Sequence, residues 1–166
     1  VLAPGNYGLD YLHAQLPGLA AIPVVKCSNF IGDALDMAAA AHFEEVLLVG
    51  HVGKLCKLAG GVMNTHSHTA DCRTELFCTY AAVSGAGPEI CRQLLRAATT
   101  DACIEILDAA RLREPVMAGM LEAIQRHLDR RAAGAFRVGA ILFSNQFGPL
   151  GQTATAKEFL QTWNTP

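Results

Sequence analysis

Short apolar runs along the chain predict buried strands. They cover residues 1–3, 24–26, 46–49 and 136–143, and polar or glycine-containing turns follow them. Between the runs, apolar residues recur every three or four positions, which is typical of helices with one buried face. Strands separated by helical stretches require crossover connections, which favour a mostly parallel sheet covered on both faces. We therefore expect a single α/β domain over residues 1–166, a three-layer αβα sandwich with a mostly parallel, Rossmann-like sheet.

Start and stop residues indicate where the helices lie. Thr69 is expected to be the N-cap of a helix over residues 71–83, in which Cys72, Leu76 and Val83 share one face. Thr100 is expected to cap a later helix, with Asp101 in its first turn. The other expected helices run from residue 10 to 16, end near residue 41, cover residues 54–58, begin at Pro88, and extend from Pro115 to Gly134.

Composition restricts the class of protein. Of the 166 residues, 51% are hydrophobic and 17% are charged, which indicates a globular body with a sizeable core. The net charge of −2 argues against a general nucleic-acid or acidic-membrane binder. The sequence shows neither a membrane-spanning apolar run nor a signal peptide, so we expect a soluble cytoplasmic protein. A chain that starts at the end of a strand, without an initiator Met, suggests a piece of a longer polypeptide.

The six cysteines form no Cys-x-x-Cys pair, and several fall at apolar helix positions. A disulfide scaffold would be smaller and richer in loops. We therefore expect reduced thiols that behave as small hydrophobic residues.

Three turns with a related composition each follow a predicted strand. They cover residues 5–8, 28–32 and 144–148, and each combines Asn, an aromatic residue and Gly. Ligands of open parallel sheets bind beyond the carboxyl ends of the strands, where these turns would meet. Turn geometry alone also explains Asn and Gly at such positions. Their recurrence at several strand ends favours a ligand cleft.

The segment from Gly50 to Leu55 superficially resembles a phosphate-binding loop. A P-loop has four residues between its glycines and Ser or Thr after its lysine. Here two residues separate Gly50 from Gly53, and Leu55 follows Lys54. Hydrolysis of a nucleoside triphosphate is therefore a poor fit. A glycine turn after a strand still lets backbone N–H groups approach an adenosine or carboxylate group.

The polar segment from Thr65 to Cys72 leaves three interpretations open. His66, His68, Asp71 and Cys72 could be metal ligands, although no second Cys/His pair lies at zinc spacing. Ser67 could be a nucleophile, although the chain has no GxSxG motif. The segment could also simply cap the following helix, whose N-terminal N–H groups favour an anion.

Several sequence blocks resemble the CbiD family of cobalt-precorrin-5B C1-methyltransferases. They are PGNYG, VKCSNFIGDALD, ILFSNQFGPLG and the long block VLLVGHVGKLCKLAGGVMNTHSHTADCR. The likeness runs through essentially the whole chain. Members of that family have an additional N-terminal region, so the resemblance implies a C-terminal domain. It also implies methyl transfer from S-adenosylmethionine to C1 of a cobalt corrinoid, in anaerobic cobalamin biosynthesis.

The resemblance implies roles for particular residues. The catalytic candidates are His66, Ser67, His68 and Asp71, and His66, His68 or Asp71 would assist proton movement on the macrocycle. The substrate carries many carboxylates, and a basic rim of Lys26, Lys54, Lys57 and Arg73, with Asn145 beside it, would bind them. The cofactor S-adenosylmethionine is expected against Gly5, Asn6, Gly8, Ser28, Asn29, Gly50, His51 and Gly53.

The expected partners are the cobalt-corrinoid substrate and the missing N-terminal domain, with no nucleic acid and no membrane. Association with a second copy of the chain stays open. Cobalt would arrive inside the substrate, because the chain has no dedicated metal ligand set. The alternative function is a non-catalytic corrinoid- or nucleotide-binding domain of a larger enzyme.

Overall fold

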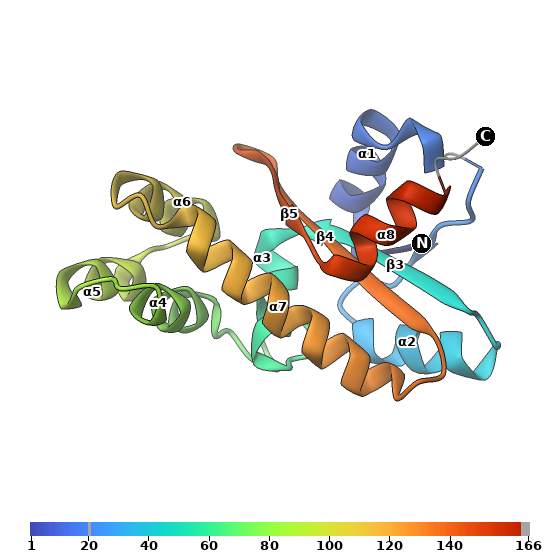
Figure 1. Ribbon diagram of the computed structural model, residues 1–166. Coiled ribbons are helices and arrows are strands. Elements are labelled where there is room, and N and C mark those ends of the chain that lie inside the picture. The colour runs from blue at the N-terminus through green and yellow to red at the C-terminus, as the bar shows by residue number, and fades with distance from the viewer. Residues whose placement is uncertain (20, 164–166) are drawn as a thin grey trace.

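In the computed structural model, which describes residues 1–19 and 21–163, helices and strands alternate along much of the chain (Figure 1). The strands are β1 (Leu2–Ala3), β2 (Val25–Lys26), β3 (Glu45–His51), β4 (Arg137–Ser144) and β5 (Gly148–Gln152). The helices are α1 (Asn6–Gln15), α2 (Ile31–Ala40), α3 (Val52–Leu55), α4 (Arg73–Val83), α5 (Pro88–Arg96), α6 (Thr100–Ala109), α7 (Arg113–Ala132) and α8 (Ala154–Trp163). Two 3₁₀ turns, η1 (Pro17–Leu19) and η2 (Cys56–Gly60), complete the described elements.

The strands form one mixed sheet in the order β2-β1-β3-β4-β5. β1 to β4 are parallel, and β5 runs antiparallel to β4, which confirms the expected mostly parallel sheet. β3 lies in the middle of the sheet, with Leu48 level with Leu2 of β1 and Val46 level with Val138 of β4. From β1 the chain first adds β2 on one side and then β3 on the other. The topological switch point therefore lies between β1 and β3.

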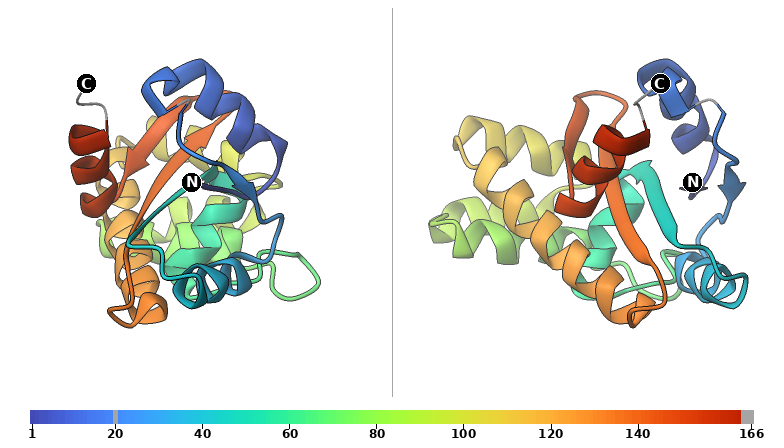
Figure 2. Two further views of the ribbon diagram at one scale, coloured as in Figure 1. Left: turned by 90° about the vertical axis from the view of Figure 1, so that its right-hand side faces the viewer. Right: turned by 45° about the vertical axis from the view of Figure 1, so that its right-hand side comes forward.

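Helices cover both faces of the sheet, which confirms the three-layer sandwich. Leu47 and Val49 of β3 pack in the cluster under α1 and α8, whereas Val46 and Leu48 pack in the cluster under α2, α3, η2 and α7. This alternation follows from the two-residue period of a strand, and it explains why β3 is apolar throughout. Figure 2 shows α1 and α8 together on one side of the sheet, with α2 and α7 on the other.

α4, α5 and α6 extend the second helical layer away from α1 (Figure 1). Phe77, Leu94 and Ile104 are fully buried between these helices and α7, so this lobe shares the main core. The six cysteines are free, and three of them are buried. None of the helices in the described residues is long and apolar enough to span a bilayer.

Several helix starts differ from the expected ones. α4 begins at Arg73 with Cys72 as its N-cap, because Thr69 is held in a preceding turn by its N–H bond to His66 O (2.9 Å). The cap of α6 is Thr99, whose side chain accepts from Ala102 N, instead of Thr100. α1 begins at Asn6, α3 at Val52 and α7 at Arg113, so each starts before the predicted residue, and α7 contains Pro115 in its first turn.

The hairpin β4–β5 and helix α8 were not among the predicted elements. β5 contains two glycines and Pro149 in five residues, a composition that disfavours strands. It forms nonetheless because it lies at the sheet edge, where an irregular register between Leu142 and Phe143 accommodates it. α8 follows at once and packs on β4.

The close contact between α8 and β4 depends on Gly139. A Cβ atom there would lie 2.5 Å from Ala156 N and 2.9 Å from Ala156 Cβ. We predict that Gly139→Ser lowers the free energy of unfolding by about 1–3 kcal/mol through overpacking. The matched control is Gly87→Ser, because an added Cβ meets no heavy atom within 4 Å there. Urea unfolding followed by circular dichroism measures both variants, and equal stabilities would contradict this packing.

Candidate functional site

The carboxyl ends, or tips, of the parallel strands β1, β2 and β3 are joined by contacts between residues at or just after these ends. Lys54, just after β3, donates from Nζ to Ser28 O beyond β2 at 3.4 Å. Lys26, the last residue of β2, donates from Nζ to Asn6 Oδ1 at the start of α1, 3.1 Å away. The tips of β1, β2 and β3 therefore form one group beside the switch point. We call these residues, with Gly5, His51 and Gly53, the tip cluster.

Gly5 leaves space beside Lys54 of this cluster. Its φ of +108° is strained for any residue with a Cβ atom, and that Cβ would lie 3.7 Å from Lys54 Nζ. Burial lowers the pKa of Lys54, although the nearby Cys27 acts in the opposite direction. An anionic group bound here would stabilise the charged ammonium. The β1 tip thus offers open backbone beside a partly desolvated cation.

His51 caps the short helix α3. Its Nδ1 accepts the Gly53 N–H at 3.0 Å, which fixes the neutral tautomer with hydrogen on Nε2. The ring lies 6.0 Å from the ring of Tyr7 and meets Phe143 edge-on at 5.7 Å. Burial lowers the pKa of His51, while the charge of Asp101 raises it less. His51 is therefore a neutral donor placed between two tips.

An aromatic cleft of about 320 Å³ lies next to the tip cluster, between α1 and the ends of β4 and β5. Tyr11 stacks on Phe143 inside it, with ring centroids 4.1 Å apart. A cleft with aromatic walls and a few polar groups is typical of sites for flat organic ligands. Its lining comprises Tyr7, Asp10, Tyr11, Ala14, Gln15, Phe143, Ser144, Asn145, Gly148 and Pro149.

The first turn of α6 fixes the β4–β5 turn. Ser144 donates from Oγ to Asp101 Oδ1 at 2.8 Å and accepts from the N–H groups of Gln146 and Phe147. Gly53 lies next to the first turn of α6, because a Cβ atom added to it would be 3.5 Å from Thr100 Oγ1. These contacts position Asn145 at the cleft. The sequence indicated Asp101 only as a residue of a helix start. Its hydrogen bond to Ser144 was not predicted, because 43 positions separate the two residues.

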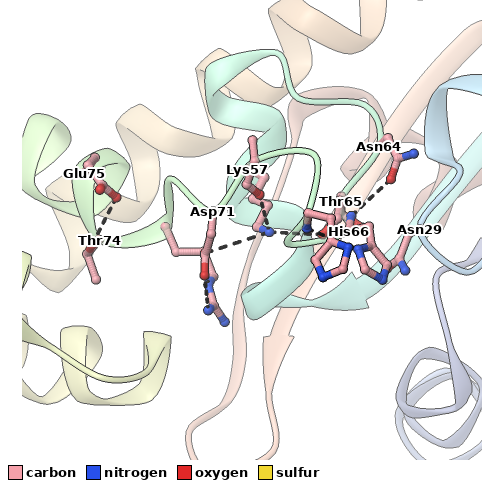
Figure 3. A network of polar contacts seen from close by, with 11 residues as sticks. Asn29, Lys57, Asn64, Thr65, His66, Asp71, Thr74 and Glu75 are labelled. Carbon is pink, nitrogen blue, oxygen red and sulfur yellow. Dashed lines mark hydrogen bonds and ion pairs between the residues drawn. The ribbon is translucent and has the colours of Figure 1, made fainter.

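The polar loop over residues 61–72 is attached to the tip of β2 (Figure 3). Thr65 donates from its N–H to Asn29 O at 2.9 Å and from Oγ1 to Asn29 Oδ1 at 3.2 Å. Phe30 and Asn64 also form an antiparallel bridge. Asn29 therefore holds Thr65 with both its backbone carbonyl and its side chain, and it is not among the residues that line the aromatic cleft.

Lys57 does not lie on the exposed basic rim that was expected. Its side chain is 3% exposed, and Nζ donates to Thr65 O at 3.0 Å and to Ala70 O at 2.7 Å. Asp71 Oδ1 is 3.9 Å away (Figure 3). A buried ammonium needs such partners. In η2 it therefore clamps both ends of the 65–71 segment from inside.

Asp71 and Arg73 form a bidentate ion pair. The guanidinium Nε and Nη2 donate to the two carboxylate oxygens at 2.7 and 2.8 Å. These bonds lower the pKa of Asp71, which makes its carboxylate a weaker base. Both residues, with Thr74 and residues 97–100, line a smaller cleft of about 150 Å³.

His66, Ser67 and His68 are exposed at the top of the loop. The two imidazoles meet edge-on with ring centroids 4.9 Å apart, and the backbone N–H of His68 donates to His66 Nδ1 at 3.2 Å. Neither histidine is among the residues that line the two clefts above. The described residues contain no group of three or more His, Cys, Asp or Glu that could hold a metal ion.

Gly8 and Gly50 permit close packing behind the tips. A Cβ at Gly8 would lie 2.7 Å from Val49 O, so α1 rests directly on β3. A Cβ at Gly50 would lie 2.8 Å from Pro4 Cγ. Both glycines are buried, so they set the positions of the tips without exposing backbone at the surface.

A family model described as "CbiD, C-terminal domain" matches residues 64–154. The chain belongs to the CbiD C-terminal domain family. The match confirms the resemblance found in the sequence, and it includes the 65–71 segment, the first turn of α6 and the tip of β4.

Curated relatives named cobalt-precorrin-5B C(1)-methyltransferase match over most of this CbiD-family chain. The protein of Ruminiclostridium cellulolyticum is 41% identical over 145 residues, which is 87% of this chain and 38% of the relative. The protein of Moorella thermoacetica is 35% identical over 167 residues, 98% of this chain and 44% of the relative. The Methanocaldococcus jannaschii protein is 35% identical over 81% of this chain and 37% of its own length. The chain thus spans about two fifths of these relatives. No solved structure matches it.

The clamp formed by Lys57 in this CbiD-family domain predicts a local effect of its removal. Lys57→Met keeps the length of the side chain but leaves Thr65 O and Ala70 O without their donor. We expect a loss of about 1–3 kcal/mol in unfolding free energy and faster amide exchange in residues 61–72. The control Lys26→Met removes an exposed lysine, and it should leave exchange in the loop unchanged. Equal exchange in both variants would refute the clamp.

The lowered pKa of His51 predicts a pH dependence of stability. Protonation is less favourable in the folded domain than in the unfolded chain, so the contribution of His51 is present above pH 6.5 and is lost as the pH falls through the lowered pKa. His51→Asn keeps an N-cap acceptor but does not titrate. Urea unfolding between about pH 7 and pH 5 should show wild type losing stability relative to this variant. A difference that stays constant with pH would rule this out.

Proposed function

We propose that this chain is the C-terminal part of an S-adenosylmethionine-dependent methyltransferase that methylates C1 of cobalt-precorrin-5B in anaerobic cobalamin biosynthesis. The family match and the names of the relatives support the enzyme class. The observation that carries a ligand site in this part is the tip cluster, where three strand ends meet beside an aromatic cleft. A cytoplasmic location belongs to the same proposal.

Methyl transfer mainly requires that two reactants are aligned. S-adenosylmethionine supplies an activated methyl group when bound, so the protein needs no nucleophilic side chain. Orientation alone can supply about 7–11 kcal/mol of the barrier. The tip cluster suits this task because hydrogen bonds and packing glycines fix it: Lys54 to Ser28 O, His51 to Gly53, and Gly8 against β3.

The residues at the tips fit the methyl donor in size and chemistry. The aromatic cleft of about 320 Å³ lies within the range of small-molecule sites, and Tyr7 and Tyr11 suit the adenine ring. Lys54 suits the carboxylate of the methionine part, because Gly5 leaves the space beside its ammonium open. His51 Nε2 and Asn145 are further hydrogen-bonding groups toward the same ligand.

The corrinoid substrate carries carboxylates that need cations. Lys26 is exposed at the β2 tip, and Arg73 is half-buried at the smaller cleft. The ion pair with Asp71 holds the Arg73 guanidinium in place without hiding it, since 35% of its side chain is exposed. In an otherwise acidic chain, these cations with Lys54 form the local basic surface that we assign to the substrate.

His66 and His68 are the groups we assign to proton movement on the macrocycle. Their imidazoles are exposed and adjacent, and the loop that carries them is fixed to the β2 tip by Thr65 and Asn29. Asp71 is less suited to act as a base, because Arg73 lowers its pKa. Ser67, between the histidines, stays available to orient them or the substrate.

The alternative is a binding domain without chemistry of its own. One observation favours it: His66 and His68 lie outside the aromatic cleft, so the groups assigned to proton movement do not line the assigned donor site within this chain. Catalysis would then depend on the part of the polypeptide that these residues do not span. Both functions share the ligand site at the tips.

Lys54→Met in the complete polypeptide tests the proposed site. Removal of a charged hydrogen-bond donor should weaken binding of S-adenosylhomocysteine by roughly 10- to 100-fold in calorimetry. Lys157→Met is the matched control, because Lys157 is exposed on α8 away from the tips. Binding unchanged by Lys54→Met would remove the β3 tip from the site.

The isolated 166-residue chain separates the two functions. Binding of both S-adenosylhomocysteine and a corrinoid to it supports a self-contained site. Binding of the corrinoid alone supports the non-catalytic domain.

A further inference from the structure

Large apolar side chains lie exposed along β2 and α2. Val25, Phe30, Met37 and Phe43 are between 54% and 71% exposed, and they are half of the large hydrophobic residues that are exposed in the described part of the chain. They surround a groove of about 500 Å³ whose floor includes Leu2, Cys27, Ala34 and Ala38. We call this surface the β2–α2 face. An apolar patch of this kind marks an interaction site more often than free surface.

The same face carries an open sheet edge. β2 is the outermost strand, and the N–H groups of Val25 and Cys27 bond to the carbonyls of Val1, just before β1, and Ala3, the last residue of β1. Since alternate residues of a strand point to opposite neighbours, the backbone of Lys26 faces away from β1. An edge with free backbone groups is a template for another strand. Apolar side chains beside it would pack against that strand.

We propose that a strand-bearing segment of the remaining polypeptide docks on the β2–α2 face and extends the sheet beyond β2. This inference rests on the proposed function, in which the chain is one part of a longer methyltransferase. The relatives are more than twice as long as the region they share with this chain, so the length required for such a segment exists in them.

A segment of another domain suits this face better than a second copy of the chain. β2 has only two residues, so backbone pairing at this edge supplies few hydrogen bonds to any partner, and a stable partner must also cover the apolar groove. A longer segment can pair with β2 and also cover Met37 and Phe43, at the opposite end of the groove from the tips. The groove lining contains Lys26 and Asp33 as its charged residues, so an apolar strand matches it.

The face also adjoins the proposed ligand site. Lys26 belongs to the tip cluster and lines the groove, and Phe30 is paired with Asn64 of the histidine-bearing loop. A strand added beyond β2 would therefore bring its own carboxyl or amino end next to the tips. The docked part then lies beside the proposed ligand site.

Hydroxyl-radical footprinting of the complete polypeptide and of the 166-residue chain tests the docking. We expect oxidation of Met37 and Phe43 to be several-fold lower in the complete polypeptide, with Leu95, exposed on α5, equally oxidised in both. Met37→Asp in the complete polypeptide should restore oxidation of Phe43. The matched control Val83→Asp, on the exposed face of α4, should not.

Two results would overturn the docking. One is equal oxidation of Met37 and Phe43 in both proteins. The other is protection in the 166-residue chain alone that grows with concentration, which would identify a second copy as the occupant. The footprinting readout does not depend on activity. If a complete polypeptide with an unprotected β2–α2 face catalyses methylation, the docking is wrong and the proposed function stands. If the face is protected but no methylation occurs, the docking stands and the proposed function is wrong.

Discussion

The parallel pairing of β3 with both β1 and β4 is the constraint on which the site depends. β3 is buried on both faces, and its seven residues are in register with β4 from Glu45–Arg137 to His51–Phe143. This pairing places the ends of β1, β3 and β4 at one edge, and the switch point between β1 and β3 leaves their connections diverging to opposite faces. Gly8 and Gly50 then let α1 and the Pro4 turn approach β3 closely. The positions of Lys54 and His51 follow from these contacts.

Polar groups near the tips hold two loops that sheet pairing alone does not position. Lys57 is buried so that one ammonium can bind the carbonyls of Thr65 and Ala70, which holds the histidine loop against η2. Asp101 does the same for the β4–β5 turn through Ser144. Four charged groups around the tip cluster thus divide into two kinds. Lys57 and Asp101 stabilise loops, whereas Lys26 and Lys54 remain at the surface of the site.

The sequence predicted the parts of the fold that depend on local pattern. The apolar runs of β3 and β4 were recognisable because both strands are buried on both faces, and the three Asn- and Gly-containing turns did follow strands, namely β1, β2 and β4. β5 escaped prediction because its glycines and Pro149 are tolerated only at a sheet edge, which is a tertiary property. The burial of Lys57 was equally invisible, since a lysine beside Leu58 reads as an exposed residue of a short helix. Thr100 and Asp101 join the site only through contacts between distant segments.

The β2–α2 face and the tip cluster share Lys26 of β2, so the incomplete sheet edge and the proposed ligand site are parts of one arrangement. The claim that decides this account is that a ligand binds at the β1/β3 switch point. A crystal structure of this chain with S-adenosylhomocysteine measures it most directly. We predict electron density beside Gly5 and Lys54, with the adenine ring against Tyr7 and Tyr11. Density in the smaller cleft at Arg73, or in the groove at Met37, with the tips left to solvent, would contradict it.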